Sequence, residues 1–238
     1  MYSWGISDFA VFIPVTKEYP ITKERPMKTN YLILVNTAHK IPADYIDSVE
    51  LVEMRGYDDE PFRAEKQAAA HFCSLQKASA QAGIEILLSS AYRSVRRQQE
   101  IREEFLAQYG EDYVRRYDAM PGFSEHHTGL ALDFVAKING KWMINKSEIM
   151  ERAQELQPVY DLLPGYGFIL RYLKGKEEIT GYPAEPWHIR YVGDPAVAAE
   201  ITKRGITFEE FLVKAGIQLE LYLYKAGMEP PGQNGVRQ

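Results

Sequence analysis

The sequence predicts an α+β protein, and three observations lead to this class. Short apolar runs typical of strands recur along the chain, and longer amphipathic stretches typical of helices lie between them. The 238 residues are 45% hydrophobic, 26% charged and 12% aromatic, which are the proportions of an ordinary globular protein. No run approaches the roughly 18 apolar residues of a membrane span. We therefore expect one main domain with a single core.

The N-terminal half begins with an irregular segment and continues with strands and two helices. Residues 1–30 contain three prolines and little periodicity, so the domain is expected to begin near Tyr31. Apolar residues spaced three and four apart predict a helix over 61–83, with Pro61 in its first turn and Gly83 at its end. The other elements expected here are strands at 31–35, 49–54 and 84–90 and a helix at 95–109.

In the C-terminal half, helices and strands are again interleaved. Thr207 and Glu210 form a capping-box pattern at the start of the last helix. The tail 225–238, rich in proline and glycine, is expected to be disordered. The expected strands are 130–135, 167–172 and 188–192, and the expected helices are 147–163, 195–203 and 207–215.

Charge and cysteine content exclude several classes of function. The chain has 28 Lys and Arg against 33 Asp and Glu, so it lacks the basic excess expected of a nucleic-acid-binding protein. Cys73 is the only cysteine, which rules out an internal disulfide and a cysteine-based zinc cluster, and its helical context predicts a buried thiol. The apolar run 9–15 is too short for a signal peptide, so as written the protein is expected to be cytoplasmic, or extracytoplasmic if the sequence is a piece of a longer chain.

One histidine lies just before an apolar strand that contains an aspartate. A turn at Thr128 and Gly129 would return His126 to the side of the strand that carries Asp133. An aspartate buried in such a strand without a partner is costly, and a cation would compensate its charge. The alternating residues Leu130, Leu132 and Phe134 are expected to face the core.

A second histidine, His188, follows Glu185 by three residues at the start of another apolar strand. Two histidines and one carboxylate with an open position form a common catalytic zinc site, and a nearby glutamate that is not a ligand is the usual general base. His126, Asp133 and His188 are therefore candidate ligands, with Glu185 as the candidate base. The spacing alone favours a chance arrangement of hydrogen-bonded structural histidines over a metal site.

Several ordered motifs resemble those of the zinc D-Ala-D-Ala peptidases of the VanY, VanX and VanXY type, which share a metal-binding fold with lysostaphin-type and Hedgehog-type proteins. The main motif consists of Ser124, His126, Gly129, Ala131 and Asp133, followed by Glu185 and His188. Residues 90–94 with Gln98, and the segments 166–172, 176–181 and 185–193, resemble further parts of the family in the same order. The resemblance covers roughly 31–216, which leaves 217–238 as a C-terminal extension.

The resemblance implies a small central antiparallel sheet with flanking helices and one Zn²⁺ per chain. The ion would be bound by His126, Asp133 and His188. Glu185 would take a proton from the attacking water and return it to the leaving amine, and Arg93 would stabilise the developing oxyanion or bind the substrate carboxylate. The resemblance also assigns substrate contacts to Ser124 and Gln98, and a place in the pocket wall or in the core to Trp187.

The implied activity is that of a D,D-carboxypeptidase that removes the terminal D-Ala from a peptidoglycan stem peptide or its precursor. A D,D-dipeptidase, an L,D-carboxypeptidase or an enzyme with two activities would use the same residues. A metal-containing binding module without activity is the alternative from another class. Because such a module needs no general base, the presence of Glu185 argues against it. His39, His71 and His127 are expected to have no catalytic role.

Overall fold

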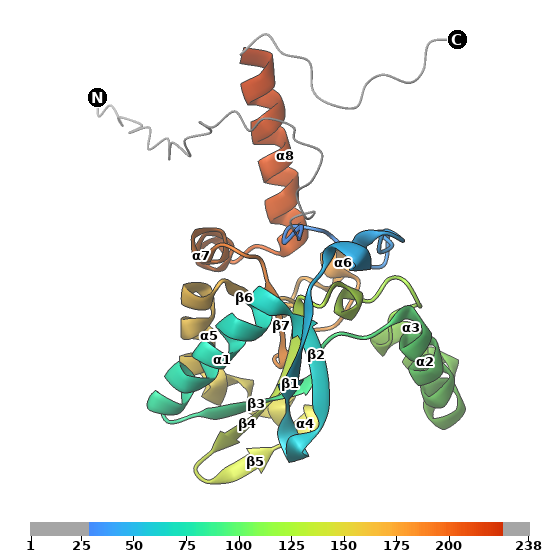
Figure 1. Ribbon diagram of the computed structural model, residues 1–238, viewed down its shortest axis with the longest axis vertical. Helices are drawn as coiled ribbons and strands as arrows, with labels where there is room; N and C mark the ends of the chain where they lie inside the picture. Colours follow the sequence, from blue (N-terminus) through green and yellow to red (C-terminus); the bar gives the residue numbers. More distant parts are fainter. Residues whose placement is uncertain (1–28, 226–238) are drawn as a thin grey trace, which may run out of the picture.

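A computed structural model describes residues 29–225, with side-chain surroundings described as far as residue 216 (Figure 1). The irregular segment expected over 1–30 and the tail expected to be disordered lie almost wholly outside these residues. No helix in the described part of the chain is long and apolar enough to span a membrane.

A five-stranded antiparallel sheet forms the centre of the domain. Its strands run in the order β3-β4-β7-β6, and β5 pairs with β4. A separate antiparallel pair, β1 and β2, lies beside it. The small antiparallel sheet predicted for the domain is therefore confirmed. The strands are β1 Leu51–Arg55, β2 Pro61–Glu65, β3 Glu85–Ser90, β4 Ala131–Ile138, β5 Lys141–Met143, β6 Phe168–Leu170 and β7 His188–Tyr191.

Helices flank the sheet, and α2 and α3 lie together at one side of the molecule (Figure 1). The helix expected over 95–109 is confirmed with its bounds as α2. The last helix is longer than expected, since it continues to Lys225. The helices are α1 Lys66–Gln81, α2 Val95–Tyr109, α3 Glu111–Tyr117, α4 Lys146–Glu151, α5 Gln157–Leu162, α6 Glu177–Thr180, α7 Pro195–Arg204 and α8 Phe208–Lys225.

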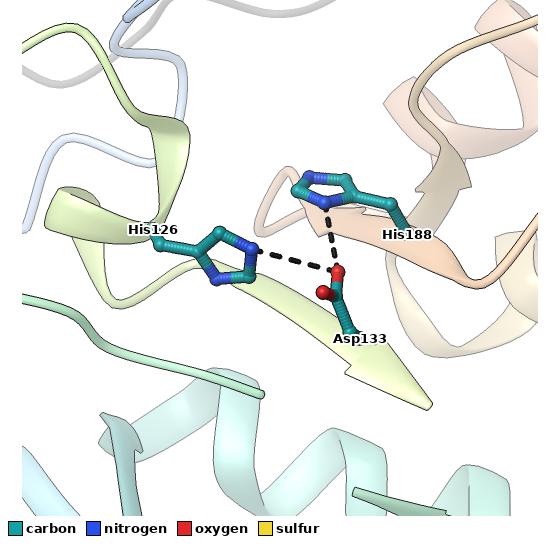
Figure 2. A group of neighbouring side chains, drawn as sticks. All are labelled: His126, Asp133 and His188. Carbon is teal, nitrogen blue, oxygen red and sulfur yellow. Dashed lines mark ion pairs between the residues drawn. The ribbon is translucent and has the colours of Figure 1, made fainter. Parts of the chain in front are cut away.

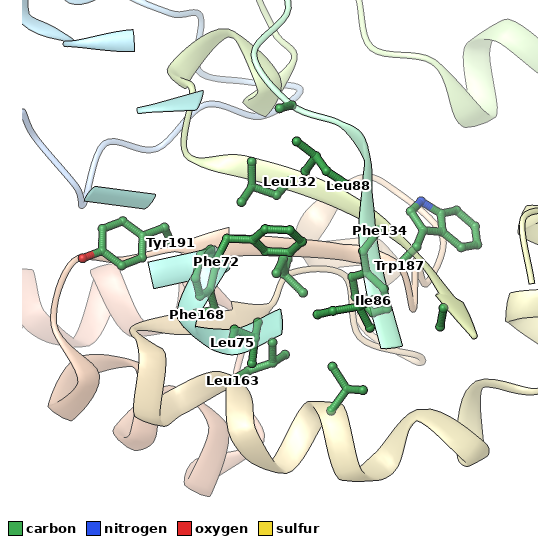
Figure 3. Packing of buried hydrophobic residues seen from close by; sticks show 14 of the residues in the cluster. Phe72, Leu75, Ile86, Leu88, Leu132, Phe134, Leu163, Phe168, Trp187 and Tyr191 are labelled. Atoms are coloured by element: carbon green, nitrogen blue, oxygen red, sulfur yellow. The ribbon is translucent and has the colours of Figure 1, made fainter. Parts of the chain in front are cut away.

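The main core lies between α1 and the sheet (Figure 3). Phe72 and Leu75 of α1 are fully buried, as are Leu132 and Phe134 of β4. Burial of each such side chain contributes roughly 1.5–3 kcal/mol to folding. The alternation predicted for the strand after Gly129 is thus confirmed, and it leaves Asp133 on the other face of β4.

Residues 31–35 do not form the expected strand. The backbone carbonyls of Tyr31 and Ile33 each accept a hydrogen bond from Nη2 of Arg190, at 2.9 Å in both cases. An apolar run suits a strand only where a neighbouring strand provides partners for its backbone. Here a buried guanidinium provides them instead.

The helix expected over 61–83 is shorter than its pattern suggests. Residues Pro61–Glu65 form β2, and α1 begins after Glu65, whose side chain accepts a hydrogen bond from the Ala68 amide at 2.8 Å. Cys73 of α1 is exposed, so the prediction of a buried thiol was wrong.

The helix expected over 147–163 is broken into α4, a 3-10 turn at Ala153–Leu156, α5 and a second 3-10 turn at Leu163–Tyr166. Pro158 and Pro164 each lie in the first turn of a new segment. Because proline lacks an amide hydrogen and is favoured at such positions, both residues start a segment rather than continue one.

Candidate metal centre

Side chains from two distant parts of the sequence meet where β4 and β7 pair. Asp133 of β4 lies opposite His188 of β7, and His126 comes from the 3-10 turn Glu125–Thr128 that precedes β4. All three are buried, and one ligand atom of each lies within 4.8 Å of the others. Oδ1 of Asp133 is 2.9 Å from Nδ1 of His188 and 3.5 Å from Nε2 of His126 (Figure 2). The structure therefore brings the three candidate ligands together.

A tight turn returns His126 to the sheet. Gly129 ends the 3-10 turn with φ at 70°, a left-handed conformation that favours glycine. A Cβ atom there would lie 2.9 Å from Cδ2 of Leu51 and 3.2 Å from the backbone nitrogen of Glu65. The glycine is thus required both by backbone conformation and by lack of space.

The hydrogen bonds of the two histidines determine which ring nitrogen remains free. Nδ1 of His126 lies 2.8 Å from the carbonyl oxygen of Ala91, which can only accept, so Nδ1 carries the hydrogen. Nε2 of His188 lies 3.2 Å from Oε2 of Glu125, so Nε2 is the protonated nitrogen of the neutral ring. When His188 is neutral, Nε2 of His126 and Nδ1 of His188 therefore both face Asp133 with a lone pair.

Asp133 provides the test of whether this group fits a metal ion. Its buried Oδ1 has no hydrogen-bond partner among the residues that the structure describes, because neither histidine contact has hydrogen-bond geometry. An unpartnered buried carboxylate oxygen is costly unless another charge compensates it. Two imidazole nitrogens and one carboxylate oxygen facing one point are a ligand set that divalent metals use in catalytic sites. The residues present fit a divalent cation.

The protonation of the two histidines differs without a metal. Burial lowers the pKa of His126 to about 4 and keeps this ring neutral. Burial also disfavours charge on His188, but contacts with Asp133 and Glu125 outweigh it and raise the pKa of His188 to about 9. A cation that binds between these residues therefore takes the place of a proton on His188.

Glu185 lies beside the three candidate ligands. The backbone nitrogen of His188 donates to the carbonyl oxygen of Glu185 at 3.1 Å, which closes a turn at the start of β7. Oε2 of Glu185 is 3.6 Å from Nδ1 of His188, and burial raises the pKa of the carboxyl group. This is the environment expected of a carboxylate that accepts and returns a proton.

A cleft of about 310 Å³ opens over these residues. Arg93 and Ser124 line it together with Glu185 and the ligands. The Ser124 hydroxyl does not cap the turn that it precedes and has no hydrogen-bond partner in the described part of the chain. The other walls come from α2, α3 and the segments before β7, and include Phe105, Tyr117, Lys146, Tyr172 and Tyr182.

Gln98 lies behind Arg93. Nη1 of Arg93 donates to Oε1 of Gln98 at 2.8 Å, and Nη2 donates to Oγ of Ser90 at 3.2 Å. The Gln98 amide is fully buried and donates to Oδ1 of Asp118 at 2.7 Å and to the carbonyl oxygen of Ala119 at 2.8 Å. The amide thus holds the Arg93 guanidinium, and direct contact of Gln98 with substrate stays a prediction.

Trp187 lies in the core, one of its two expected placements, and is not among the residues that line the cleft over the metal ligands. It is 7% exposed and belongs to the main core, and it also lines a second cavity next to Arg93 and Asp133. Its indole nitrogen has no hydrogen-bond partner in the described part of the chain, and Nζ of Lys146 lies 4.8 Å from the centre of its ring. A role in binding substrate stays a prediction.

The other three histidines do not line the cleft. Nδ1 of His127 lies 2.6 Å from the carbonyl oxygen of Arg93, and its Nε2 accepts from the Gly122 amide at 3.0 Å, so it supports the surrounding loops. His71 contacts the backbone of Tyr166, and His39 is exposed.

Sequence reasoning missed several residues around the centre, and Glu125 is the most closely connected of them. Its carboxylate contacts His188 and two buried arginines, Arg171 and Arg190. Arginines inside apolar strand segments require buried carboxylate partners. Arg171 and Arg190 were therefore the signal in the sequence that could have led to a buried carboxylate such as Glu125. Asp118, Lys146, Tyr172 and Tyr182 carried no comparable signal in the sequence.

Comparison with known families adds a decisive observation to this geometry. A family model described as VanY, D-alanyl-D-alanine carboxypeptidase, matches residues 62–194, which include His126, Asp133, Glu185 and His188. The chain belongs to the VanY family. It is thus a member of a family of cell-wall peptide carboxypeptidases, and the family resemblance predicted from the motifs is confirmed.

Individual VanY-family and related proteins are similar over most of the chain. A D-alanyl-D-alanine carboxypeptidase of Enterococcus faecalis is 35% identical over 194 residues, covering 76% of this chain and 65% of that protein. The chain thus spans slightly less than two thirds of that relative.

Two solved structures share the fold. The first is a variant of the D,D-pentapeptidase VanY from a VanB-type resistance cassette in complex with Zn(II). It is 31% identical with a TM-score of 0.62, covering 76% of this chain and 98% of that one. The second is the L,D-carboxypeptidase LdcB, described for its recognition of peptidoglycan. It is 34% identical with a TM-score of 0.63, covering 76% of this chain and 85% of that one.

Proposed function

We propose that the chain is a zinc-dependent D,D-carboxypeptidase that removes the terminal D-Ala from peptidoglycan peptides, or their precursors, ending in D-Ala-D-Ala. The observation that carries the proposal is the convergence of His126, Asp133 and His188 next to the Glu185 carboxylate in an open cleft. The VanY structure with Zn(II) supports zinc as the metal. The family model and the E. faecalis relative support the D,D specificity.

In this mechanism Glu185 performs the proton transfers. A zinc ion bound by the three ligands supplies Lewis-acid activation of water and of the scissile carbonyl. Glu185 accepts a proton as the water oxygen bonds to the carbonyl carbon. It then delivers that proton to the nitrogen of the leaving D-Ala as the C–N bond breaks. The raised pKa of the Glu185 carboxyl group suits both steps.

Arg93 binds negative charge in the cleft. Its guanidinium stays protonated and is held by Gln98 and Ser90, so its orientation is fixed before substrate arrives. It is placed to bind the terminal carboxylate of the peptide or to stabilise the oxyanion that develops during attack. The Ser124 hydroxyl, which has no protein partner in the described residues, supplies a further hydrogen bond to the peptide terminus.

An L,D-carboxypeptidase acting on tetrapeptide stems is the second candidate, because LdcB is 34% identical to this chain and the VanY structure 31%. A D,D-dipeptidase would use the same metal centre with a smaller substrate. A binding module without activity is disfavoured, since it does not require a carboxylate with a raised pKa beside the metal ligands.

The test is the release of D-Ala from three substrates in parallel, each with and without a chelator. The substrates are free D-Ala-D-Ala, a pentapeptide ending in D-Ala-D-Ala and a tetrapeptide ending in a single D-Ala. Chelator-sensitive release that is fastest from the pentapeptide is the expected result. Faster release from the tetrapeptide would establish the L,D activity, and faster release from the dipeptide would establish the dipeptidase. No release from any substrate by the zinc-loaded protein would overturn the proposal.

A further inference from the structure

A buried carboxylate contacts the metal centre from the side opposite Asp133. Oε2 of Glu125 lies 3.2 Å from Nε2 of His188, the ring nitrogen that faces away from Asp133. Oε1 of Glu125 accepts from Nε of Arg171 at 2.8 Å and from Nη1 of Arg190 at 2.7 Å. The Glu125 side chain is completely inaccessible to solvent. Both of its oxygen atoms are therefore occupied.

The two arginines keep this carboxylate charged. Arg171 and Arg190 each place a guanidinium nitrogen within 2.8 Å of Oε1 of Glu125, and cations this close compensate the charge of a buried carboxylate. Arg171 also makes two hydrogen bonds to Glu209, and both arginines are fully buried. Two cations thus face two carboxylates inside the protein, which is the condition under which such charges are retained.

The second histidine of the centre is held differently. Nδ1 of His126 donates to a neutral backbone carbonyl, whereas His188 faces an ionised carboxylate. A carboxylate acceptor fixes the tautomer and orientation of a metal-binding imidazole and increases its basicity. Without it, an imidazole is able to present either of its two nitrogens.

We infer that Glu125 is a positioning residue of the metal centre, which holds the His188 ring so that Nδ1 faces Asp133 and His126. The inference rests on the proposed metal-dependent function and deepens it. It gives a role to Glu125, which stands in the sequence between Ser124, a residue that lines the cleft, and His126. The same 3-10 turn supplies one ligand and orients another.

Glu209 provides a matched control. It belongs to the same buried network and pairs with Arg171 at the start of α8, and its hydrogen bonds go to Arg171 and Asn36 rather than to His188. Glu125→Gln and Glu209→Gln each remove one negative charge from the network. Only the first changes the partner of His188.

The first measurement is the zinc affinity of the purified variants, determined by competition with a chromophoric chelator, beside thermal unfolding of the metal-free proteins. Glu125→Gln is expected to weaken zinc binding by about 10- to 100-fold. Glu209→Gln is expected to lower the unfolding temperature while keeping an affinity close to that of the original protein. Equal affinities for the Glu125→Gln variant and the original protein, or equal losses in both variants, would overturn the inference.

The second measurement needs no variant and decides the matter if Glu125→Gln does not fold. Nitrogen chemical shifts of the histidine rings in the zinc-loaded protein are expected to show Nδ1 of His188 bound to zinc and Nε2 carrying a hydrogen. Zinc on Nε2 of His188 would overturn the inference. A protein that binds zinc through Nδ1 but releases D-Ala from no substrate would overturn the proposed function and leave this inference standing.

Discussion

At the residue scale, the metal centre depends on which nitrogen each histidine leaves free. His126 is fixed by a backbone carbonyl and His188 by a buried carboxylate, and the two rings therefore meet Asp133 through different atoms. Among the described residues Oδ1 of Asp133 has no hydrogen-bond partner, so this buried carboxylate oxygen is available to a cation. The candidate ligands bind the metal and Glu185 transfers the proton. Substitutions of the two kinds of residue should therefore affect zinc binding and turnover differently.

Glu185→Ala is expected to retain zinc and to lose nearly all turnover, by about 10²- to 10⁴-fold, because the general base is removed while the ligands remain. Metal content and kcat of the purified variant check this. Glu178→Ala, which changes an exposed glutamate of α6, is the control and should leave both unchanged. Loss of zinc from the Glu185 variant would contradict its assignment as the base.

His126→Ala and His188→Ala are each expected to lose zinc and activity together, because a site with one histidine and one carboxylate binds zinc weakly. Metal analysis after gel filtration and D-Ala release measure the two losses. The exposed His39 supplies the control substitution His39→Ala. A variant of either ligand that kept full zinc occupancy would remove that residue from the site.

At the element scale, the turn between the 3-10 segment and β4 places His126 beside Asp133. Gly129→Ala is expected to destabilise the protein by more than the 1–2 kcal/mol that a left-handed alanine costs, because its Cβ would also meet Leu51 and Glu65. Gly83→Ala is the matched control, since Gly83 also has a positive φ but nothing lies within 4 Å of its added Cβ. If urea unfolding showed the same loss in free energy of unfolding for both variants, the contact of the added Cβ with Leu51 and Glu65 would contribute nothing.

The capping box at the start of α8 gives a pH-dependent prediction. The backbone nitrogen of Thr207 donates to Oε2 of Glu210 at 2.8 Å, and the Glu210 amide donates to Oγ1 of Thr207 at 3.1 Å. This backbone hydrogen bond, with the nearby Lys176, lowers the pKa of Glu210. A carboxyl group whose pKa is lowered on folding stabilises the protein above its unfolded pKa and loses that effect as pH falls through the folded value.

Glu210→Gln should therefore lower the free energy of unfolding by about 1 kcal/mol or less at pH 7. The difference from the original protein should shrink once pH falls below the pKa of an unfolded glutamate, about 4.3, and disappear below the lowered pKa of the folded state. Urea unfolding at several pH values provides the measurement. A difference that is independent of pH would show that the charge of Glu210 does not contribute.

At the scale of the whole molecule, the metal centre joins segments that are far apart in the sequence. Arg190 connects β7 to the backbone of Tyr31 and Ile33, and Arg171 connects the segment after β6 to Glu209 of α8. Glu125 joins both arginines to the centre. The ligands are thus held by the same network that attaches both ends of the described chain to the sheet.

Removal of zinc is therefore expected to lower the stability of the whole domain. A ligand that binds only the folded state adds about 2.7 kcal/mol at a free concentration of 100 times its Kd. Thermal unfolding of chelator-treated protein should occur at a lower temperature, and added zinc should restore it. The His126→Ala variant should show no such zinc-dependent change. An equal change in that variant would place the stabilising ion elsewhere.

Sequence patterns correctly predicted the elements whose structure depends on residues close together in the chain. Ser94 and Gly110 mark the bounds of α2 in the sequence. The alternation of apolar residues in β4 likewise indicates which of its side chains face the core. The prediction failed where partners are distant. Residues 31–35 are held by Arg190 rather than by a neighbouring strand. The helix expected over 147–163 failed for a local reason, because Pro158 starts a new segment within it.

The sequence by itself determined the α+β class, the central strands, the VanY-type motifs and the identity of the candidate ligands. Only the tertiary structure decided which nitrogen of each histidine is free, that Gln98 lies behind Arg93, and that Glu125 contacts His188. The physical reason is that residue type and spacing determine local backbone and chemistry. The orientation of a buried polar side chain, in contrast, depends on hydrogen-bond partners supplied by segments far away in the chain.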